Sequence, residues 1–354
     1  AEEVGEVAVD TETTSLDPHQ ADLVGISLCS KIGKACYIPV GHKSPKCLKK
    51  DAVIKKLKKI LEDPSIKKIG QNIKFDFIVF YKCGITLSSM EDTMLMSYVL
   101  DAGKNRHNMD TLSEIHLGHK TISFKDMVGT GKKEINFSEV ELDKAKDYAA
   151  EDADVTFRLY KKFIKNLKSE KMINIYEIFE KPLIKILAFM EIEGVEIDSK
   201  FLKSLSSKFE KKIQKLEKEV FKISKKEFNI ASPKQLGEII YNDLKIAGLK
   251  KTKKGSFATS ASVLEDLAFK GHEFPKLILD WRQVSKLKNT YSDALPEHLN
   301  PNTKRVHTSF LLAATTTGRL ASSDPNLQNI PIKSEDGKDI RKAFTAKKGH
   351  LLIS

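Results

Sequence analysis

The stretch that decides the fold is Val7-Ala8-Val9-Asp10-Thr11-Glu12, close to the start of the chain. Its three apolar residues predict the body of a buried β-strand over Glu6–Thr11, and its two acids follow where that strand ends. Residues i and i+2 of a strand project to the same face, so Asp10 and Glu12 should point in one direction. The sequence therefore predicts a sheet that presents a pair of carboxylates.

The residues that follow extend this strand into an α/β domain. Two further strands are predicted at Asp22–Cys29 and Lys34–Val40, separated by turn-forming residues. After them we expect one strand at Lys67–Gly70 and helices at Asp51–Leu61, near Phe75–Tyr81, and at Asp92–Leu100, Thr111–His116 and Ser138 to about Lys168. Three antiparallel strands followed by alternating helices and strands predict an α/β domain that ends near residue 170.

The second half of the sequence has a different pattern. From Ser199 to Ser224, apolar residues recur every three or four positions, which predicts a long helix with a coiled-coil-like seam. A second long helix is predicted over Pro275–Leu295. Between them lies the basic loop Lys250-Lys251-Thr252-Lys253-Lys254-Gly255-Ser256. Such a loop is typical of an arm that reaches an anionic partner, and equally of a solvated loop without a role.

Length and composition limit the class of protein. A chain of 354 residues exceeds what one hydrophobic core usually serves, so we expect two or more domains. No apolar run is long enough to span a bilayer, and the N-terminus has acids where a signal peptide would have bases. The four cysteines form no CxxC pair, which favours reduced thiols in a cytoplasmic protein over a zinc site.

The positive charge is concentrated in the second half. Residues 1–170 hold 27 Lys and Arg against 26 Asp and Glu, whereas residues 171–354 hold 33 against 22. Such an excess is expected of a half that binds a phosphate backbone. Only six of the 60 basic residues are Arg, however, and a general bias toward Lys would raise the count without any such role. Charge alone therefore leaves nucleic-acid binding undecided.

Three further residues extend the acidic pair into a candidate catalytic site. Asp76 lies at a predicted strand-to-helix junction, and Tyr148 and Asp152 are i and i+4 neighbours on one face of the long helix. Converging carboxylates cannot all stay ionised side by side unless cations neutralise them, and Mg²⁺ suits oxygen ligands. Two such ions serve phosphodiester hydrolysis, one activating water and one stabilising the leaving oxygen. The set therefore predicts two divalent metal ions, Mg²⁺ with Mn²⁺ as the alternative.

The wider motifs carry a family resemblance over essentially the whole chain. The strings VAVDTETTSLD, IGQNIKFD and YAAEDADVTF resemble the three exonuclease motifs of the DnaQ-like (DEDDy) superfamily. Downstream, GVEID, FNIASPKQL, RVHTSF and TTTGRLASSDPNLQNIP resemble the thumb and the start of the palm in bacterial family A DNA polymerases. The resemblance implies a ribonuclease H-like exonuclease domain with a mixed sheet, a mainly helical thumb and an incomplete α+β palm. It also implies proofreading during DNA replication and repair.

The resemblance implies a role for each exonuclease residue. Asp10, Glu12 and Asp152 would hold the metal that carries the nucleophilic water, and Asp10 would bridge to the second metal, which Asp76 reaches largely through water. Tyr148 would align the nucleophile. The residues implied to contact the DNA strand in this domain are Leu16, which would pack against the frayed 3′ terminal base, and Asn72. Glu151 and Asp154 do not match the motif positions and are interpreted as helix-surface charges.

Other residues are implied to contact duplex DNA. Arg319, Gln328 and Asn329 match family positions near the primer terminus on the minor-groove side, where acceptors recur across all base pairs. The lysines of the basic loop, Lys250, Lys251, Lys253 and Lys254, are expected to bind the phosphate backbone.

Together these interpretations predict a 3′→5′ exonuclease that releases nucleoside monophosphates from DNA 3′ ends. The expected domains are an exonuclease domain at 1–170, a duplex-binding helical thumb at 171–300 and the start of a palm at 301–354. Because GHLLIS ends before the palm's metal-binding aspartates would appear, we expect a polymerase fragment without nucleotide transfer. The expected partner is DNA, with no membrane, and the expected state is a monomer in the bacterial cytoplasm.

Two alternatives stay open at this point. A stand-alone exonuclease of the ribonuclease D type would share the carboxylate motifs but not TGRLASSDPNLQNIP. A DNA-binding module with a silent exonuclease site would share the basic second half, but it would have no need of intact carboxylates.

Overall fold

The structure, a computed structural model, describes residues 1–246, 257–332 and 334–353. It divides into two compact units. Unit 1 comprises Ala1–Gly194 and His307–Asn326, and unit 2 comprises Val195–Val306 and Leu327–Ser354. The predicted basic loop with Lys250, Lys251, Lys253 and Lys254 lies outside the described residues. Among the helices that the structure describes, none has both the length and the apolar composition needed to cross a bilayer.

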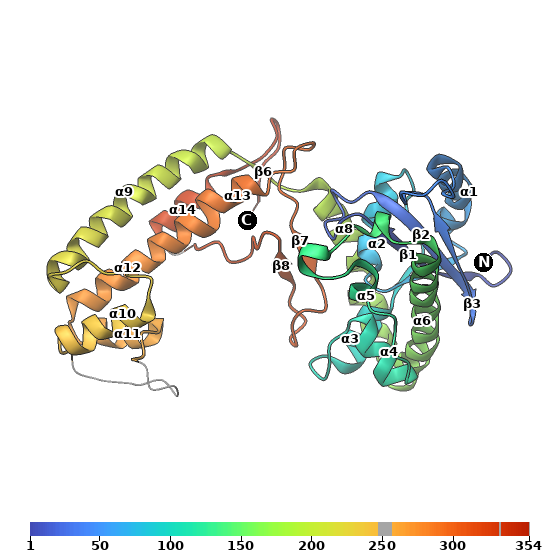
Figure 1. The fold of residues 1–354 in the computed structure, drawn as a ribbon, viewed down its shortest axis with the longest axis horizontal. Helices are drawn as coiled ribbons and strands as arrows, with labels where there is room; N and C mark the ends of the chain where they lie inside the picture. Colours follow the sequence, from blue (N-terminus) through green and yellow to red (C-terminus); the bar gives the residue numbers. More distant parts are fainter. Residues whose placement is uncertain (247–256, 333, 354) are drawn as a thin grey trace. The chain divides into compact units, whose positions relative to one another are not determined.

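A mixed sheet with the strand order β3-β2-β1-β4-β5 forms the centre of unit 1 (Figure 1). Its strands are β1 (Glu6–Thr13), β2 (Leu23–Lys31), β3 (Lys34–Pro39), β4 (Lys67–Gly70) and β5 (Met90–Asp92). The β1–β2 and β2–β3 pairs are antiparallel, and the β1–β4 and β4–β5 pairs are parallel. The predicted mixed sheet is confirmed. Strand β5 was not predicted from the sequence, because three residues are too few to show a strand pattern.

Helices cover this sheet. They are α1 (Lys50–Glu62), α2 (Ile73–Lys82), α3 (Thr93–Asp101), α4 (Met109–Leu117), α5 (Phe124–Val128), α6 (Leu142–Ser169), α7 (Ile173–Ile175) and α8 (Lys181–Glu193), with the 3-10 turns η1 (Gly131–Lys133) and η2 (Phe137–Glu139) and the π-helix η3 (Tyr176–Glu180). Helix α6 packs against β1, β2, β3 and β4, and α2 packs against β1 and α8. The two helices that carry predicted site residues therefore both contact β1.

The predicted start of the long helix was wrong. Helix α6 begins at Leu142 and not at Ser138. Asn136 accepts a hydrogen bond from the Ser138 amide, and the Glu139 side chain accepts one from the Asn136 amide, which closes η2 as a separate capped turn. Val140 is then extended, with a ψ of 139°. The chain thus makes one capped turn before the helix begins.

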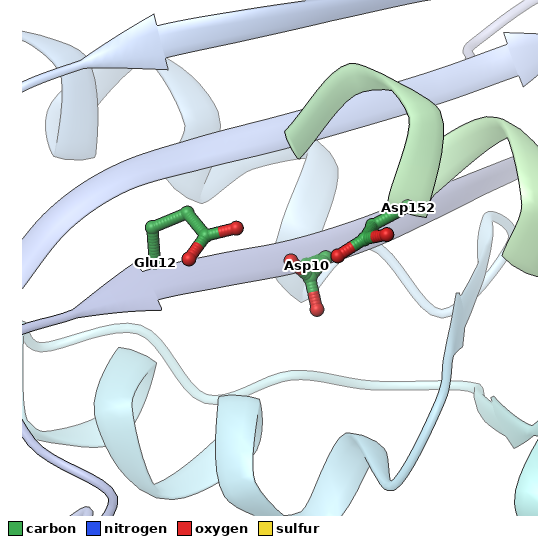
Figure 2. A group of neighbouring side chains, drawn as sticks. All are labelled: Asp10, Glu12 and Asp152. Atoms are coloured by element: carbon green, nitrogen blue, oxygen red, sulfur yellow. The ribbon is translucent and has the colours of Figure 1, made fainter. Parts of the chain in front are cut away.

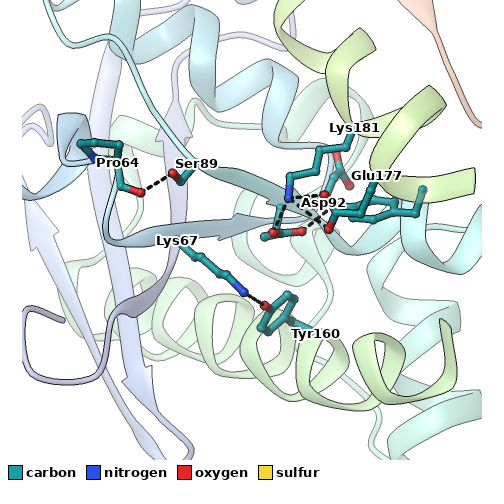
Figure 3. Close-up of polar contacts among 9 residues, drawn as sticks. Pro64, Lys67, Ser89, Asp92, Tyr160, Glu177 and Lys181 are labelled. Atoms are coloured by element: carbon teal, nitrogen blue, oxygen red, sulfur yellow. Dashed lines mark hydrogen bonds and ion pairs between the residues drawn. The ribbon is translucent and has the colours of Figure 1, made fainter. Parts of the chain in front are cut away.

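The position of α2 depends on Asp92. Its buried carboxylate accepts hydrogen bonds from the amides of Asn72 (3.1 Å) and Ile73 (3.0 Å), at the start of α2, and from those of Met94 (2.9 Å) and Leu95 (3.4 Å), at the start of α3. One side chain therefore caps two helices. A second polar group anchors the segment that follows α6, because Lys181 pairs with Glu91 (2.6 Å) and with Glu177 (2.9 Å), close to Asp92 (Figure 3).

Residues far along the chain complete unit 1. The hairpin of β7 (Ser309–Leu311) and β8 (Ala321–Ser323) belongs to it. The Phe310 amide donates to Glu191 Oε1 (2.6 Å), and the same oxygen pairs with Lys74 of α2 (2.5 Å). Lys74 and Glu191 are both buried, so this pair lies inside the packed body.

Unit 2 is mainly helical. It contains β6 (Glu196–Ile197), α9 (Ser199–Ser224), α10 (Pro233–Glu238), η4 (Ile239–Asp243), α11 (Ala261–Phe269), α12 (Glu273–Leu287), η5 (Lys288–Asp293), α13 (Ala294–Glu297), α14 (Glu335–Arg341) and β9 (Phe344–Thr345). The predicted seam is confirmed: α9 packs against α12 through its buried apolar residues. The helix predicted at Pro275–Leu295 begins at Glu273 and continues from α12 through the π-helix η5 into α13.

Asp92→Ala should lower the free energy of unfolding by about 2–4 kcal/mol, because four helix-starting amides lose their acceptor at once. Asp92→Asn keeps one carbonyl acceptor and should lower the free energy of unfolding by less. Urea denaturation followed by circular dichroism measures both. The matched control is Asp198→Ala, which removes the exposed cap of α9 and its two amide contacts. A loss in Asp92→Ala no larger than in this control would contradict the double-cap interpretation.

Candidate active site

Three carboxylates from two elements of unit 1 meet in one place. Asp10 and Glu12 lie on β1, and Asp152 lies on α6. Figure 2 shows the first two rising from the same strand and Asp152 reaching toward Asp10 from the helix. One ligand oxygen from each residue lies within 4.8 Å of the others. The i, i+2 spacing of the strand thus presents its two acids to the helix that packs across it.

Tyr148 lies one helical turn before Asp152. Its hydroxyl lies close enough to the Asp152 carboxylate for the two groups to interact. Its ring is half-buried beside Phe124 and Phe137, with ring centroids 6.1 Å and 5.9 Å away. Burial, and then the charge of Asp152, raise the pKa of Tyr148 far above its usual value, so the hydroxyl keeps its proton. The predicted Tyr148–Asp152 pair therefore lies together at the carboxylate cluster.

Asp76 joins the site from a different side. Thr11 lies between the two acids of β1, and its amide (2.9 Å) and hydroxyl (2.6 Å) both donate to Asp76 Oδ1. The backbone of Thr11 is available because the pairing of β1 with β4 ends at Ala8. Asp76 is buried and close enough to Asp10 for the two charges to interact. It is not one of the three residues whose ligand atoms meet within 4.8 Å.

The electrostatics of the site are those of crowded acids, three of them buried and Asp10 half-buried. Burial raises the pKa of Asp10 to about 6, against a hydrogen bond from the Thr11 amide. Burial, and then the charge of Asp10, raise the pKa values of Glu12, Asp76 and Asp152 well above their usual range. A donor set made of carboxylate oxygens alone fits a hard divalent cation, which would offset this repulsion. Asp10, Glu12 and Asp152 could therefore bind a metal ion.

A cleft of about 530 Å³ opens beside these carboxylates. Its lining includes Leu16, whose side chain is 89% exposed, and Tyr148. Other side chains of this wall were not predicted from the sequence: Gln71, Phe75, Met109, Phe124, Val128, Ile135 and Phe137. Five of the seven lie between α2 and α6, on α4, α5, η2 and the loop before η2, where no periodic pattern marks a residue as part of a site. Their apolar surface beside the acids suits a nucleobase.

The remaining residues of the exonuclease motifs have structural contacts. Asn72 adopts a left-handed backbone (φ 60°) at the start of α2, with its side chain exposed. Glu151 and Asp154 lie outside the carboxylate cluster, as expected, but their interpretation as helix-surface charges was wrong. Glu151 accepts from the Ile122 amide (2.6 Å), and Asp154 accepts from the Gly33 amide (2.6 Å). The first bond holds the loop before α5 against α6, and the second holds the β2–β3 hairpin against α6.

The residues predicted at the primer terminus are all exposed. Arg319 follows Gly318 in unit 1, whereas Gln328 and Asn329 belong to unit 2. In unit 1, the Tyr98 hydroxyl holds the loop before Arg319 by donating to the Thr315 carbonyl (2.6 Å) and accepting from the Gly318 amide (3.0 Å). The shared role of the three residues stays a prediction.

Comparison with known proteins covers both halves of the chain. Residues 1–168 match the 3'-5' exonuclease family model, and residues 199–354 match the DNA polymerase family A model. The DNA polymerase I of Rhizobium leguminosarum is 47% identical over 376 residues, covering 100% of this chain and 37% of that protein. That of Pseudomonas aeruginosa is 44% identical over 360 residues, covering 100% and 39%. The chain thus spans about two fifths of the length of these relatives.

A solved structure gives the same result. The POL domain of Pol1 from M. smegmatis, in complex with DNA primer-template and dNTP, superposes with a TM-score of 0.81 at 27% identity. The match covers 98% of this chain and 56% of that one. The match of residues 199–354 contradicts the ribonuclease D alternative, which does not account for a polymerase segment. The chain belongs to DNA polymerase family A and carries a 3'-5' exonuclease domain of that family.

Proposed function

We propose that this chain is a metal-dependent 3′→5′ exodeoxyribonuclease that hydrolyses the terminal phosphodiester at DNA 3′ ends and releases nucleoside monophosphates. The observation that carries the proposal is the meeting of Asp10, Glu12 and Asp152 within 4.8 Å at the wall of a cleft. An acid cluster that is largely buried at a cost in free energy, and that lines a cleft, suits a site that works with bound cations.

The proposed roles follow from the positions of the side chains. Asp10, Glu12 and Asp152 would hold one divalent ion, and Asp10 with Asp76 would serve a second; Mg²⁺ is the proposed ion and Mn²⁺ the alternative. Such ions supply water activation and stabilisation of the leaving 3′ oxygen. Tyr148, which keeps its proton and lines the cleft together with Asp152, would orient the attacking water.

The cleft suits an unpaired 3′ end. Leu16, exposed at its edge, and Phe124, in its wall, offer apolar surface to the terminal base. DNA as the substrate is supported by the solved relative, which was determined with a primer-template. We also propose that Arg319, Gln328 and Asn329 contact duplex DNA. The domains proposed are an exonuclease domain at 1–170, a thumb at 171–300 and the start of a palm at 301–354. A monomeric state and a cytoplasmic location stay predictions.

Asp10→Ala should abolish 3′→5′ degradation of a labelled single strand in Mg²⁺, because Asp10 contributes to both proposed ion sites. The fold and DNA affinity should be largely unchanged, as measured by circular dichroism and by fluorescence anisotropy. Asp51→Ala, which removes an exposed acid of α1, is the control and should keep wild-type rates. Equal rates in wild type and Asp10→Ala would refute the site, and an inactive wild type with intact DNA affinity would favour the silent-module alternative.

Excision should be faster from single strands and mismatched 3′ ends than from paired ends. A cleft that accepts a frayed end requires unpairing, which costs a few kcal/mol and least at a mismatch. Quenched-flow digestion of three substrates with one 3′ sequence measures the order. Equal rates on all three would count against the proofreading role.

Asp10→Asn should stabilise the metal-free chain at neutral pH by about 1–2 kcal/mol. The pKa of Asp10 in the folded chain, about 6, lies above the ordinary value of 3.8. Folding therefore favours the protonated acid, and this stability is present below pH 4 and lost as the pH rises through 6. Melting curves in EDTA from pH 4 to 8 measure the difference, which should vanish at low pH. A difference independent of pH would contradict the assignment.

A further inference from the structure

Tyr37 lies on the same face of the sheet as the two acids of β1. In register, Asp10 faces Ser27 and Ser27 faces Tyr37, while in the next row Glu12 faces Gly25. Paired residues of neighbouring strands share a face, so the phenol stands above the sheet beside the carboxylates. Between Asp10 and Tyr37 lies Ser27, whose buried Oγ has no hydrogen-bond partner within the described part of the chain.

Gly25 leaves the space that the phenol occupies. A Cβ atom built on Gly25 would lie 2.0 Å from the Tyr37 hydroxyl oxygen, closer than any real contact. The hydroxyl thus lies directly over the residue that faces Glu12. The electrostatics agree with this placement. Burial, and next the charge of Glu12, raise the pKa of Tyr37 far above its usual value.

His42 fixes the phenol from the other side. Its Nε2 forms a 2.6 Å hydrogen bond with the Tyr37 hydroxyl. The imidazole is 7% exposed, so packing inside the domain holds it in place. A buried imidazole that is bonded through Nε2 restricts the position of the phenol hydroxyl.

The pair also leads to Tyr148. The ring centroids of His42 and Phe137 are 5.8 Å apart, and those of Phe137 and Tyr148 are 5.9 Å apart. Val24, Val128 and Val140 pack around these rings. A wall of aromatic rings therefore runs from Tyr37 through His42 and Phe137 to Tyr148. Tyr37 lies at the Glu12 end of this wall, and Tyr148 lies at the Asp152 end.

We infer that Tyr37, anchored by His42, is a positioning residue of the exonuclease site, holding Glu12 in place for the metal ion and supporting Tyr148 through Phe137. This inference rests on the proposed function. Neither residue contacts the reacting atoms. Their effect is on the geometry of two groups that do, as outer residues act in metal sites generally.

The test is Tyr37→Phe, which keeps the ring and removes only the hydroxyl. It should lower kcat for single-strand hydrolysis about tenfold, leave KM within about twofold, and raise the Mg²⁺ concentration needed for half-maximal rate. Tyr160→Phe is the matched control. It removes the hydroxyl of a buried tyrosine that is bonded to Lys67 (Figure 3) and does not line the cleft, and it should change none of these values.

A second readout does not depend on activity. Calorimetric titration of the metal-free chain with Mn²⁺ should show about tenfold weaker binding in Tyr37→Phe than in wild type, and no change in Tyr160→Phe. Equal Mn²⁺ affinities of wild type and Tyr37→Phe would overturn the positioning role. A wild type that binds Mn²⁺ but degrades no DNA would instead overturn the proposed function.

Gly25→Ala tests the placement without altering Tyr37 itself. The new methyl group should displace the phenol and weaken Mn²⁺ binding as Tyr37→Phe does. In a Tyr37→Ala background the space over Gly25 is empty, so the same methyl group should weaken Mn²⁺ binding little further. An equal loss in both backgrounds would show that the phenol does not occupy the space over Gly25 and would overturn the inference. Melting temperatures establish that each variant is folded before titration.

Discussion

Repulsion among three buried carboxylates and the half-buried Asp10 is the constraint on which the rest of the structure depends. Burial raises the pKa values of Asp10, Glu12, Asp76 and Asp152, and the charges on the neighbouring acids raise most of them further. Ionised acids in such a cluster lower the free energy of unfolding of the metal-free chain. The surrounding elements must therefore hold each acid firmly, because relaxation of any one would relieve the repulsion and open the site.

Three different elements hold the four acids. The strand alternation of β1 places Asp10 and Glu12, and the buried face of α6 places Asp152. Asp76 depends on a longer chain of contacts: Thr11 binds its carboxylate, and Asp92 caps the helix on which it lies. A site assembled from a strand, a helix and a doubly capped helix start is rigid where the chemistry requires it.

The fold and the acids could be predicted because both leave local patterns in the sequence. The apolar run before Asp10 predicts β1, and the seam of Ser199–Ser224 predicts α9 with the same bounds as the structure. Contacts between distant residues leave no such pattern. The bond between Thr11 and Asp76 joins residues 65 positions apart, and the bond between Asp154 and Gly33 joins residues 121 apart. The aromatic wall of the cleft and the role of Glu151 were missed for the same reason.

The contacts of unit 1 also show why the exonuclease site should not be considered in isolation from the polymerase-family segment. His307–Asn326 lies within residues 199–354, which match DNA polymerase family A, yet it packs into the body that holds the carboxylates. Lys74, two residues before Asp76, is buried and paired with Glu191, and Glu191 is held in turn by the Phe310 amide. A buried Lys without its partner costs several kcal/mol. The helix that carries Asp76 is therefore stabilised by residues beyond the exonuclease match, and Glu191 links it to Phe310 of the polymerase-family segment.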